Sequence, residues 1–185
     1  MKHEIVKDAE KRMAKSVEAT REELAKIRTG KASPAMLDPV RVEAYGSSMP
    51  LNQVATISTP EARLIVIQPW DKSLIGEIEK AILKADLGFN PSNDGQVIRV
   101  PIPPLNEERR QEYVRICRKI TEEGRVAVRN IRRDANEHIK KLEKNHEISE
   151  DEAHRLLDQI QEITDQHIKQ LDEIMKHKEA EIMEV

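Results

Sequence analysis

Apolar residues recur every three or four positions in three long stretches of the chain. The first stretch begins at Ile5 and ends near Gly30. The second follows the proline-rich segment VPIPPLNEE and continues for roughly 36 residues, about 54 Å of helix at 1.5 Å per residue. The third begins after Ser149, whose hydroxyl can cap a helix together with Glu152 three residues later. The spacing predicts three amphipathic helices.

One cysteine, two histidines and one glycine fall on these apolar stripes. Cys117 lies on the second stripe, which indicates a buried structural thiol rather than a nucleophile. His138 on the second stripe and His167 on the third are interpreted as packed core residues rather than metal ligands. Gly124 should cost the helix about 1 kcal/mol relative to Ala, so close packing of a neighbouring helix is expected there.

The connections between the stretches predict how they assemble. The short link KNHEISE requires the second and third helices to pack antiparallel. Their two narrow stripes make a poor closed core, and the first helix supplies the missing third stripe. We therefore predict a discontinuous three-helix bundle of residues 1–30 and 104–185, with residues 31–103 inserted as a separate domain.

The inserted segment has a different pattern. VRVEAY alternates apolar and polar residues, as a half-exposed strand does, and RLIVIQP and VIRVPIP are typical of more buried strands. One helix, capped by Asp71 or Ser73, lies between the last two, and a turn at Asn93-Asp94-Gly95 precedes the final strand. The sequence thus predicts an α+β fold: an elongated three-helix bundle with a small β/α/β domain, hinged at about residues 30–33 and 101–105.

Composition and charge favour binding over catalysis. Hydrophobic residues are 38%, aromatic residues 2% and charged residues 35% of the chain, as in long helices with much surface. The net charge is only −3, yet residues 109–133 hold nine Lys or Arg against three Asp or Glu, while residues 143–185 hold five against thirteen. A local basic surface predicts contact with a polyanion, and a merely solvated helix face is the alternative.

Several fragments resemble functional motifs and lack an essential residue. Gly30-Lys31 resembles the end of a phosphate-binding loop, but Ala32 follows where Ser or Thr is needed. Pro101 stands where a calcium loop beginning at Asn90 would need its bidentate Glu. No G-x-S-x-G elbow and no ligand-spaced histidine pair occurs. We expect no catalytic residues, no metal site and no enzyme activity.

The segment GRVAVRNIRRDAN, residues 124–136, carries the remaining candidate site. At about 100° per residue, its arginines and Asn136 fall within an arc of roughly 100°, away from the core residues Val128, Ile131 and Ala135. Arginine suits phosphate because its rigid fork binds two oxygens at once. Salt bridges to the acidic third helix are the alternative, weighed evenly for Arg133 and less for Arg132. With only four aromatic residues, no stacking platform for single-stranded bases is expected, so the partner would be folded RNA.

Four segments resemble one bacterial family, the ribosome recycling factors. They are KIRTGKASP (26–34), QPWDKS (68–73), NDGQVIRVPIPPL (93–105) and GRVAVRNIRRDAN (124–136). The resemblance covers essentially the whole chain in the right order, and its two longer motifs are quite specific.

This resemblance implies an L-shaped molecule of roughly transfer-RNA proportions. It also implies ribosome recycling after translation termination: the protein would bind the large (50S) ribosomal subunit and its rRNA. With elongation factor G and GTP it would then split the post-termination ribosome and release messenger RNA and deacylated transfer RNA. The GTP would belong to the partner, so no cofactor is expected for this chain.

The resemblance also assigns residues. It implies that Arg132 is the leading rRNA contact, followed by Arg129 and Arg28, and that Gly30 and Lys31 lie at the hinge. The full set of candidates comprises, for rRNA binding, Arg132, Arg129, Arg28, Arg125 and Arg133, and for the hinge, Gly30, Lys31, Pro101, Pro103 and Pro104. A cytoplasmic monomer is expected, because the N-terminus is too charged for a signal peptide and no apolar stretch approaches the roughly 18 residues of a membrane span.

Overall fold

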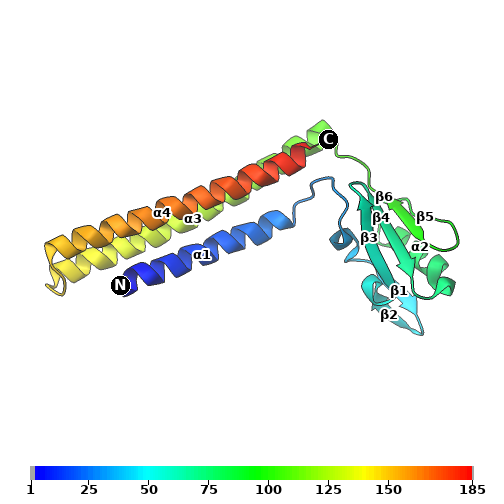
Figure 1. The fold of residues 1–185 in the computed structure, drawn as a ribbon, viewed down its shortest axis with the longest axis horizontal. Helices are drawn as coiled ribbons and strands as arrows, with labels where there is room; N and C mark the ends of the chain where they lie inside the picture. Colours follow the sequence, from blue (N-terminus) through cyan, green and yellow to red (C-terminus); the bar gives the residue numbers. More distant parts are fainter. Residues whose placement is uncertain (1–2, 185) are drawn as a thin grey trace. The chain divides into compact units, whose positions relative to one another are not determined.

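The computed structural model describes residues 3–184, and the chain divides into two compact units. One unit is formed by Met1–Thr29 together with Glu107–Val185, and the other by Gly30–Asn106. Residues 1–2 and 185, at the ends of the predicted bundle, lie outside the described residues. The first unit contains only helices, and the second contains all the strands that the structure describes (Figure 1).

Three long helices form the first unit. They are α1 (Glu4–Ala25), α3 (Glu107–Lys144) and α4 (Glu150–Met183), and each contacts the other two. Figure 1 shows α3 and α4 side by side, joined at one end by a short turn, with α1 running along them. The three predicted helices and the antiparallel packing of α3 and α4 are confirmed. The first helix ends at Ala25, earlier than the prediction near Gly30.

Side-chain caps define where two of these helices begin. The hydroxyl of Ser149 accepts a hydrogen bond from the backbone N–H of Glu152 at 3.1 Å, as predicted. The carboxylate of Glu152 lies 3.9 Å from Arg155 in the same helix. At α1, Nδ1 of His3 accepts from the N–H of Ile5 at 3.1 Å. Both caps satisfy a backbone donor that the first turn of a helix leaves unpaired.

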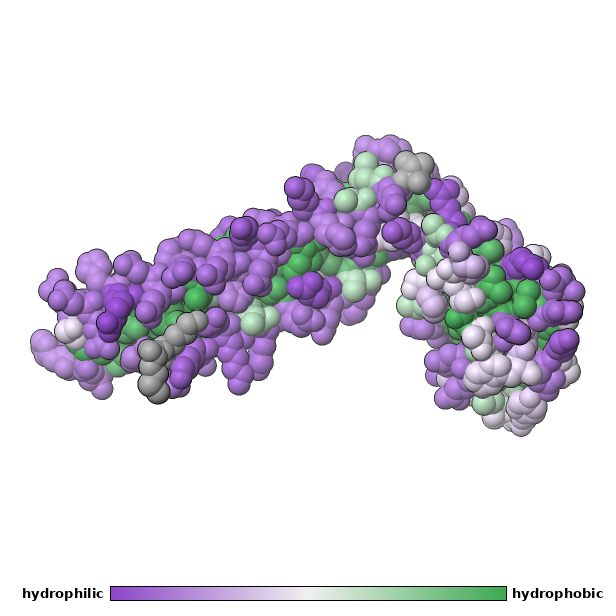
Figure 2. Space-filling view, in the orientation of Figure 1, coloured by the Kyte–Doolittle hydropathy of each residue, from purple (hydrophilic) through white to green (hydrophobic). Residues whose placement is uncertain are grey.

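The bundle core follows the apolar stripes, with one correction. His138 is exposed and Ile139 is fully buried in its place, so the prediction that His138 packs in the core is wrong. His167 is buried as predicted, with Nδ1 2.6 Å from the carbonyl oxygen of Ile163. Figure 2 shows a mostly hydrophilic bundle face, with apolar residues visible along the seams between helices.

Gly124 of α3 packs closely against α1. A Cβ atom at this position would overlap the hydroxyl of Thr20 on α1 and would lie 3.4 Å from Cδ2 of Leu171 on α4. Both neighbours are buried. Close helix packing, as expected from the sequence, therefore explains a glycine in the interior of α3.

The second unit is built on an antiparallel sheet of four strands. Their spatial order is β3 (Ala55–Glu61), β4 (Leu64–Pro69), β6 (Ile98–Pro101) and β5 (Ser92–Asn93). The strands β1 (Arg41–Ala44) and β2 (Ser47–Pro50) form a separate antiparallel pair. Three 3₁₀ segments join these elements: η1 (Pro34–Leu37), η2 (Leu51–Gln53) and η3 (Lys72–Leu74).

One helix, α2 (Ile75–Lys84), completes this unit. Its Ile78 and Ile82 are buried in one core with Ile65 and Ile67 of β4. Asp71 accepts from the N–H of Ser73 at 3.0 Å and so caps the 3₁₀ turn that leads into α2. The α+β class is confirmed, and the structure adds β2, β3 and β5 to the three predicted strands.

Candidate nucleic-acid interface

Arg125, Arg129, Arg132 and Arg133 lie on one side of α3, and we refer to them as the arginine row. All four belong to α3, which is anchored in the bundle core by Val128. Arg133 is exposed, and the other three are partly buried. The structure therefore places these four candidates together, as helical geometry predicts, but their charges are opposed to different degrees.

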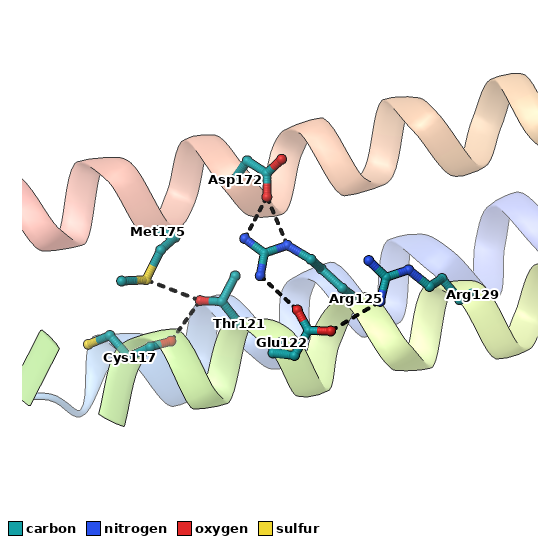
Figure 3. A network of polar contacts seen from close by, with 7 residues as sticks. All are labelled: Cys117, Thr121, Glu122, Arg125, Arg129, Asp172 and Met175. Atoms are coloured by element: carbon teal, nitrogen blue, oxygen red, sulfur yellow. Dashed lines mark hydrogen bonds and ion pairs between the residues drawn. The ribbon is translucent and has the colours of Figure 1, made fainter. Parts of the chain in front are cut away.

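Arg125 is held between α3 and α4. Its Nε and Nη2 donate to Oδ1 of Asp172 on α4, at 2.9 and 2.6 Å, and its Nη1 donates to Oε2 of Glu122 at 3.0 Å (Figure 3). Burial alone would lower the pKa of this guanidinium, but the hydrogen bonds to the two carboxylates raise it. Because its side chain is only 23% exposed, Arg125 joins the two helices and offers little charge to a partner.

Arg129 shares the same carboxylate. Its Nη1 donates to Oε1 of Glu122 at 3.1 Å, so each oxygen of Glu122 accepts from a different arginine (Figure 3). The hydrogen bonds from Arg125 and then Arg129 lower the pKa of Glu122, which keeps it ionised. The side chain of Arg129 is 42% exposed. Arg129 is therefore accessible, but partly neutralised.

Arg132 and Arg133 carry the least opposed charges of the row. Nη1 of Arg132 lies 3.4 Å from Oε1 of Gln161 on α4, a neutral amide that itself donates to Asp165 at 2.8 Å. Within residues 3–184, Arg133 forms no ion pair with α4. The ion pair of the row with the acidic third helix is made by Arg125, and for Arg133 the choice between RNA and that helix stays a prediction.

Arg28 is far from the arginine row in the sequence and does not lie on α3. It follows the end of α1 by three residues and is partly buried. Its Nε atom is buried. A role in rRNA binding stays a prediction for Arg28, as it does for every residue of the row.

The predicted hinge residues differ in their local structure. Gly30 has φ +84°, a conformation that L side chains rarely adopt, and lies against Leu105. Lys31 is exposed. Pro101 is part of β6, paired with Leu64, so it belongs to the sheet rather than to a linker.

The segment that leads from the sheet back to the bundle leaves the sheet only after Ile102, the residue that follows Pro101. The buried Ile102 donates its N–H to the carbonyl of Arg63 at 2.8 Å. Pro103 and Pro104 are exposed and lie outside helices and strands. Hinge motion stays a prediction for these residues. Because Pro101 and Ile102 are held by the sheet, the part of the predicted hinge that is free of it on this side begins at Pro103.

Three residues that shape this surface were missed by sequence reasoning: Glu122, Asp172 and Gln161. Glu122 lies three and seven residues before Arg125 and Arg129, spacings that bring side chains to the same side of a helix. That signal was available in the sequence. Asp172 and Gln161 lie on α4, and their contacts depend on how α3 and α4 are aligned.

Other kinds of site find no support in the described part of the chain. Among residues 3–184, no group of three or more His, Cys, Asp or Glu side chains is arranged to hold a metal ion. Over the same residues, no helix combines the length and apolarity needed to cross a membrane. The class that the fold and surface define is a two-unit α+β protein whose helical bundle carries a row of arginines.

Comparison with known proteins identifies the family. The family model for ribosome recycling factor matches residues 20–183. The ribosome-recycling factors of Symbiobacterium thermophilum and Carboxydothermus hydrogenoformans are 61% and 57% identical to this chain, over 100% of both sequences in each case. The chain belongs to the ribosome recycling factor family.

Solved structures agree with this assignment. A solution structure of a ribosome recycling factor is 49% identical, with a TM-score of 0.71 and complete coverage of both chains. A second structure comprises models for the T. thermophilus ribosome recycling factor and the E. coli elongation factor G bound to the E. coli post-termination complex. It is 48% identical over 98% of each chain, with a TM-score of 0.61. The resemblance stated from the four sequence segments is confirmed.

Proposed function

We propose that this protein recycles ribosomes after translation termination. It binds the large ribosomal subunit and, with elongation factor G and GTP, splits the post-termination ribosome and releases messenger RNA and deacylated transfer RNA. The observation that carries this proposal is full-length similarity to ribosome recycling factors, one of which is described together with elongation factor G on a post-termination complex. The protein acts as a cytoplasmic monomer, and the GTP is bound by elongation factor G.

The arginine row supports a binding mode for this function. Arg132 and Arg133 present guanidinium groups for which no ion pair with a carboxylate is found within residues 3–184. Such groups can each bind two phosphate oxygens, and phosphate contacts fix the position of a protein on RNA without reading its sequence. In this proposal the bundle anchors to rRNA through these two arginines and Arg129, with Arg28 as a further contact.

A splitting assay tests the proposed function. Purified post-termination ribosomes are incubated with this protein, elongation factor G and GTP, and free subunits are measured by sedimentation. Subunits should appear only when all three components are present, and the protein alone should hydrolyse no GTP. Equal splitting with and without the protein, or GTP hydrolysis by the protein alone, would contradict the proposal.

The inserted unit is proposed to move during splitting while the bundle stays bound. A variant with two added cysteines that cross-link the units tests this, and its reduced form serves as the control on the same chain. The natural Cys117 is fully buried, so it should not interfere. The oxidised form should bind ribosomes but fail to split them. Full splitting by the oxidised form would refute the movement.

A further inference from the structure

Glu122 occupies a central position among the charges of α3. Its two carboxylate oxygens are divided between two arginines: Oε2 accepts from Arg125 at 3.0 Å and Oε1 accepts from Arg129 at 3.1 Å. Figure 3 shows this carboxylate lying between the two guanidinium groups. One carboxylate thus opposes two members of the arginine row.

The two arginines are held very differently. Arg125 makes three hydrogen bonds to two carboxylates and is 23% exposed, so exchange of its partners would break its ion pair with Asp172 on α4. Arg129 makes one hydrogen bond, to Glu122, and is 42% exposed. A guanidinium has five N–H donors, so an incoming anion can reach Arg129 without disturbing the bundle.

The charges of this group cancel. Glu122 and Asp172 contribute two negative charges, and Arg125 and Arg129 contribute two positive ones. A phosphate that approaches Arg129 therefore meets the ionised carboxylate of Glu122, which is already bound to the same guanidinium. Like charges at such a distance repel one another, and water weakens this repulsion without removing it.

We infer that Glu122 competes with RNA phosphate for Arg129 and so lowers the affinity of the bundle for the ribosome. This inference rests on the proposed function, in which the arginine row contacts rRNA. A factor that acts on one ribosome after another must leave each of them. Glu122 gives Arg129 an alternative partner within the protein, and thereby favours release over a tighter complex.

The test compares two neutralising substitutions that differ only in their contacts. Glu122→Gln removes the competing charge. Glu123→Gln removes the same charge from the next residue, which is exposed and for which no ion pair is found within residues 3–184. Affinity for purified large ribosomal subunits is measured for both variants at several salt concentrations.

Glu122→Gln should bind more tightly than Glu123→Gln by about two- to fivefold, the range expected for loss of an exposed ion pair. The difference between the two variants should vanish when each is combined with Arg129→Ala, because the competition requires that guanidinium. Dissociation from the ribosome should be slower for Glu122→Gln. A far-UV circular dichroism spectrum equal to that of the wild type shows that the fold is retained.

Two results would overturn the inference. Equal affinity of Glu122→Gln and Glu123→Gln would show that contact with Arg129 is irrelevant, and weaker binding by Glu122→Gln would show that the carboxylate assists binding. If the wild type binds subunits in the same assay, either result refutes the inference about Glu122 and leaves the proposed function standing. Failure of the wild type to bind would instead refute the proposed function, and the inference with it.

Discussion

Helices α1 and α3 approach each other so closely at Gly124 that a methyl group there should destabilise the bundle. The added Cβ would overlap the hydroxyl of Thr20 and lie 3.4 Å from Leu171. That hydroxyl donates to the carbonyl of Ser16 at 3.0 Å, so turning it away would break a hydrogen bond. Thr20 is also β-branched, which leaves it few alternative rotamers in a helix.

Two opposing effects set the size of the change. Replacing Gly by Ala in a helix interior stabilises the helix by about 1 kcal/mol, whereas inserting a methyl group into a packed core costs about 1–3 kcal/mol. Gly124→Ala should therefore lower the free energy of unfolding, by up to about 2 kcal/mol. In a Thr20→Ala background the overlap is gone, and the same substitution should be neutral or stabilise by up to about 1 kcal/mol.

Urea unfolding followed by far-UV circular dichroism measures this difference across the four variants of the cycle. Gly76→Ala is the matched control, because Gly76 also lies in a helix but, apart from its chain neighbours and the backbone of its own helix, has no atom within 4 Å of the position that an added methyl group would occupy. The control should be neutral or stabilising. The steric reasoning is refuted if Gly124→Ala is more stable than the wild type, or if the effect of Gly124→Ala is no more favourable in the Thr20→Ala background than in the wild type.

Three further predictions concern single residues. Gly30→Ala should destabilise the inserted unit by about 1–2 kcal/mol, because φ +84° is unfavourable for an L side chain; urea unfolding followed by the fluorescence of the single tryptophan would show it, and an unchanged midpoint would count against it. Hydrogen bonds from the backbone N–H of Val97 and its neighbour, and from Arg99, hold the pKa of Asp94 well below its usual range. The contribution of Asp94 to the free energy of unfolding should therefore be complete above the pKa of the unfolded state and be lost as pH falls through the pKa of the folded state. Urea unfolding at a series of acidic pH values measures this dependence, and Asp94→Asn should make it flatter. Burial raises the pKa of the Cys117 thiol, so a thiol reagent should label the native protein slowly and the urea-unfolded protein fast; rapid native labelling would show that the site is open.

The helices could be predicted from the sequence because a long periodic stripe of apolar residues defines which side of each helix is buried. The prediction failed where two neighbouring residues could both continue the stripe. Ala135 is followed on its stripe by either His138 or Ile139, at spacings of three and four. Burial favours the aliphatic side chain over the imidazole, and Ile139 is the residue in the core. The strands β2 and β3 were missed because Ser47–Pro50 and most of Ala55–Glu61 are exposed or partly buried and carry little apolar alternation.

The side of α3 that bears the arginine row was predictable, but the partners of its members were not. Helical angles place Arg125 and Arg132 beside the core line and Arg133 furthest from it. Side chains next to the core line are the ones that reach a neighbouring helix, and so Arg125 meets Asp172 and Arg132 meets Gln161. Which helix lies on that side depends on tertiary packing, which a single-helix pattern does not contain.

The central claim is that the arginine row anchors the bundle to ribosomal RNA, and the salt dependence of binding tests it most directly. Affinity for large ribosomal subunits is measured over a salt series for the wild type, Arg132→Ala and Lys119→Ala. Lys119 is an exposed control on α3, about 140° round the helix from Arg132. Arg132→Ala should weaken binding about tenfold or more and reduce the slope of log affinity against log salt by about one. Lys119→Ala should leave both nearly unchanged. A wild-type affinity that does not vary with salt, or normal binding by Arg132→Ala, would contradict the claim.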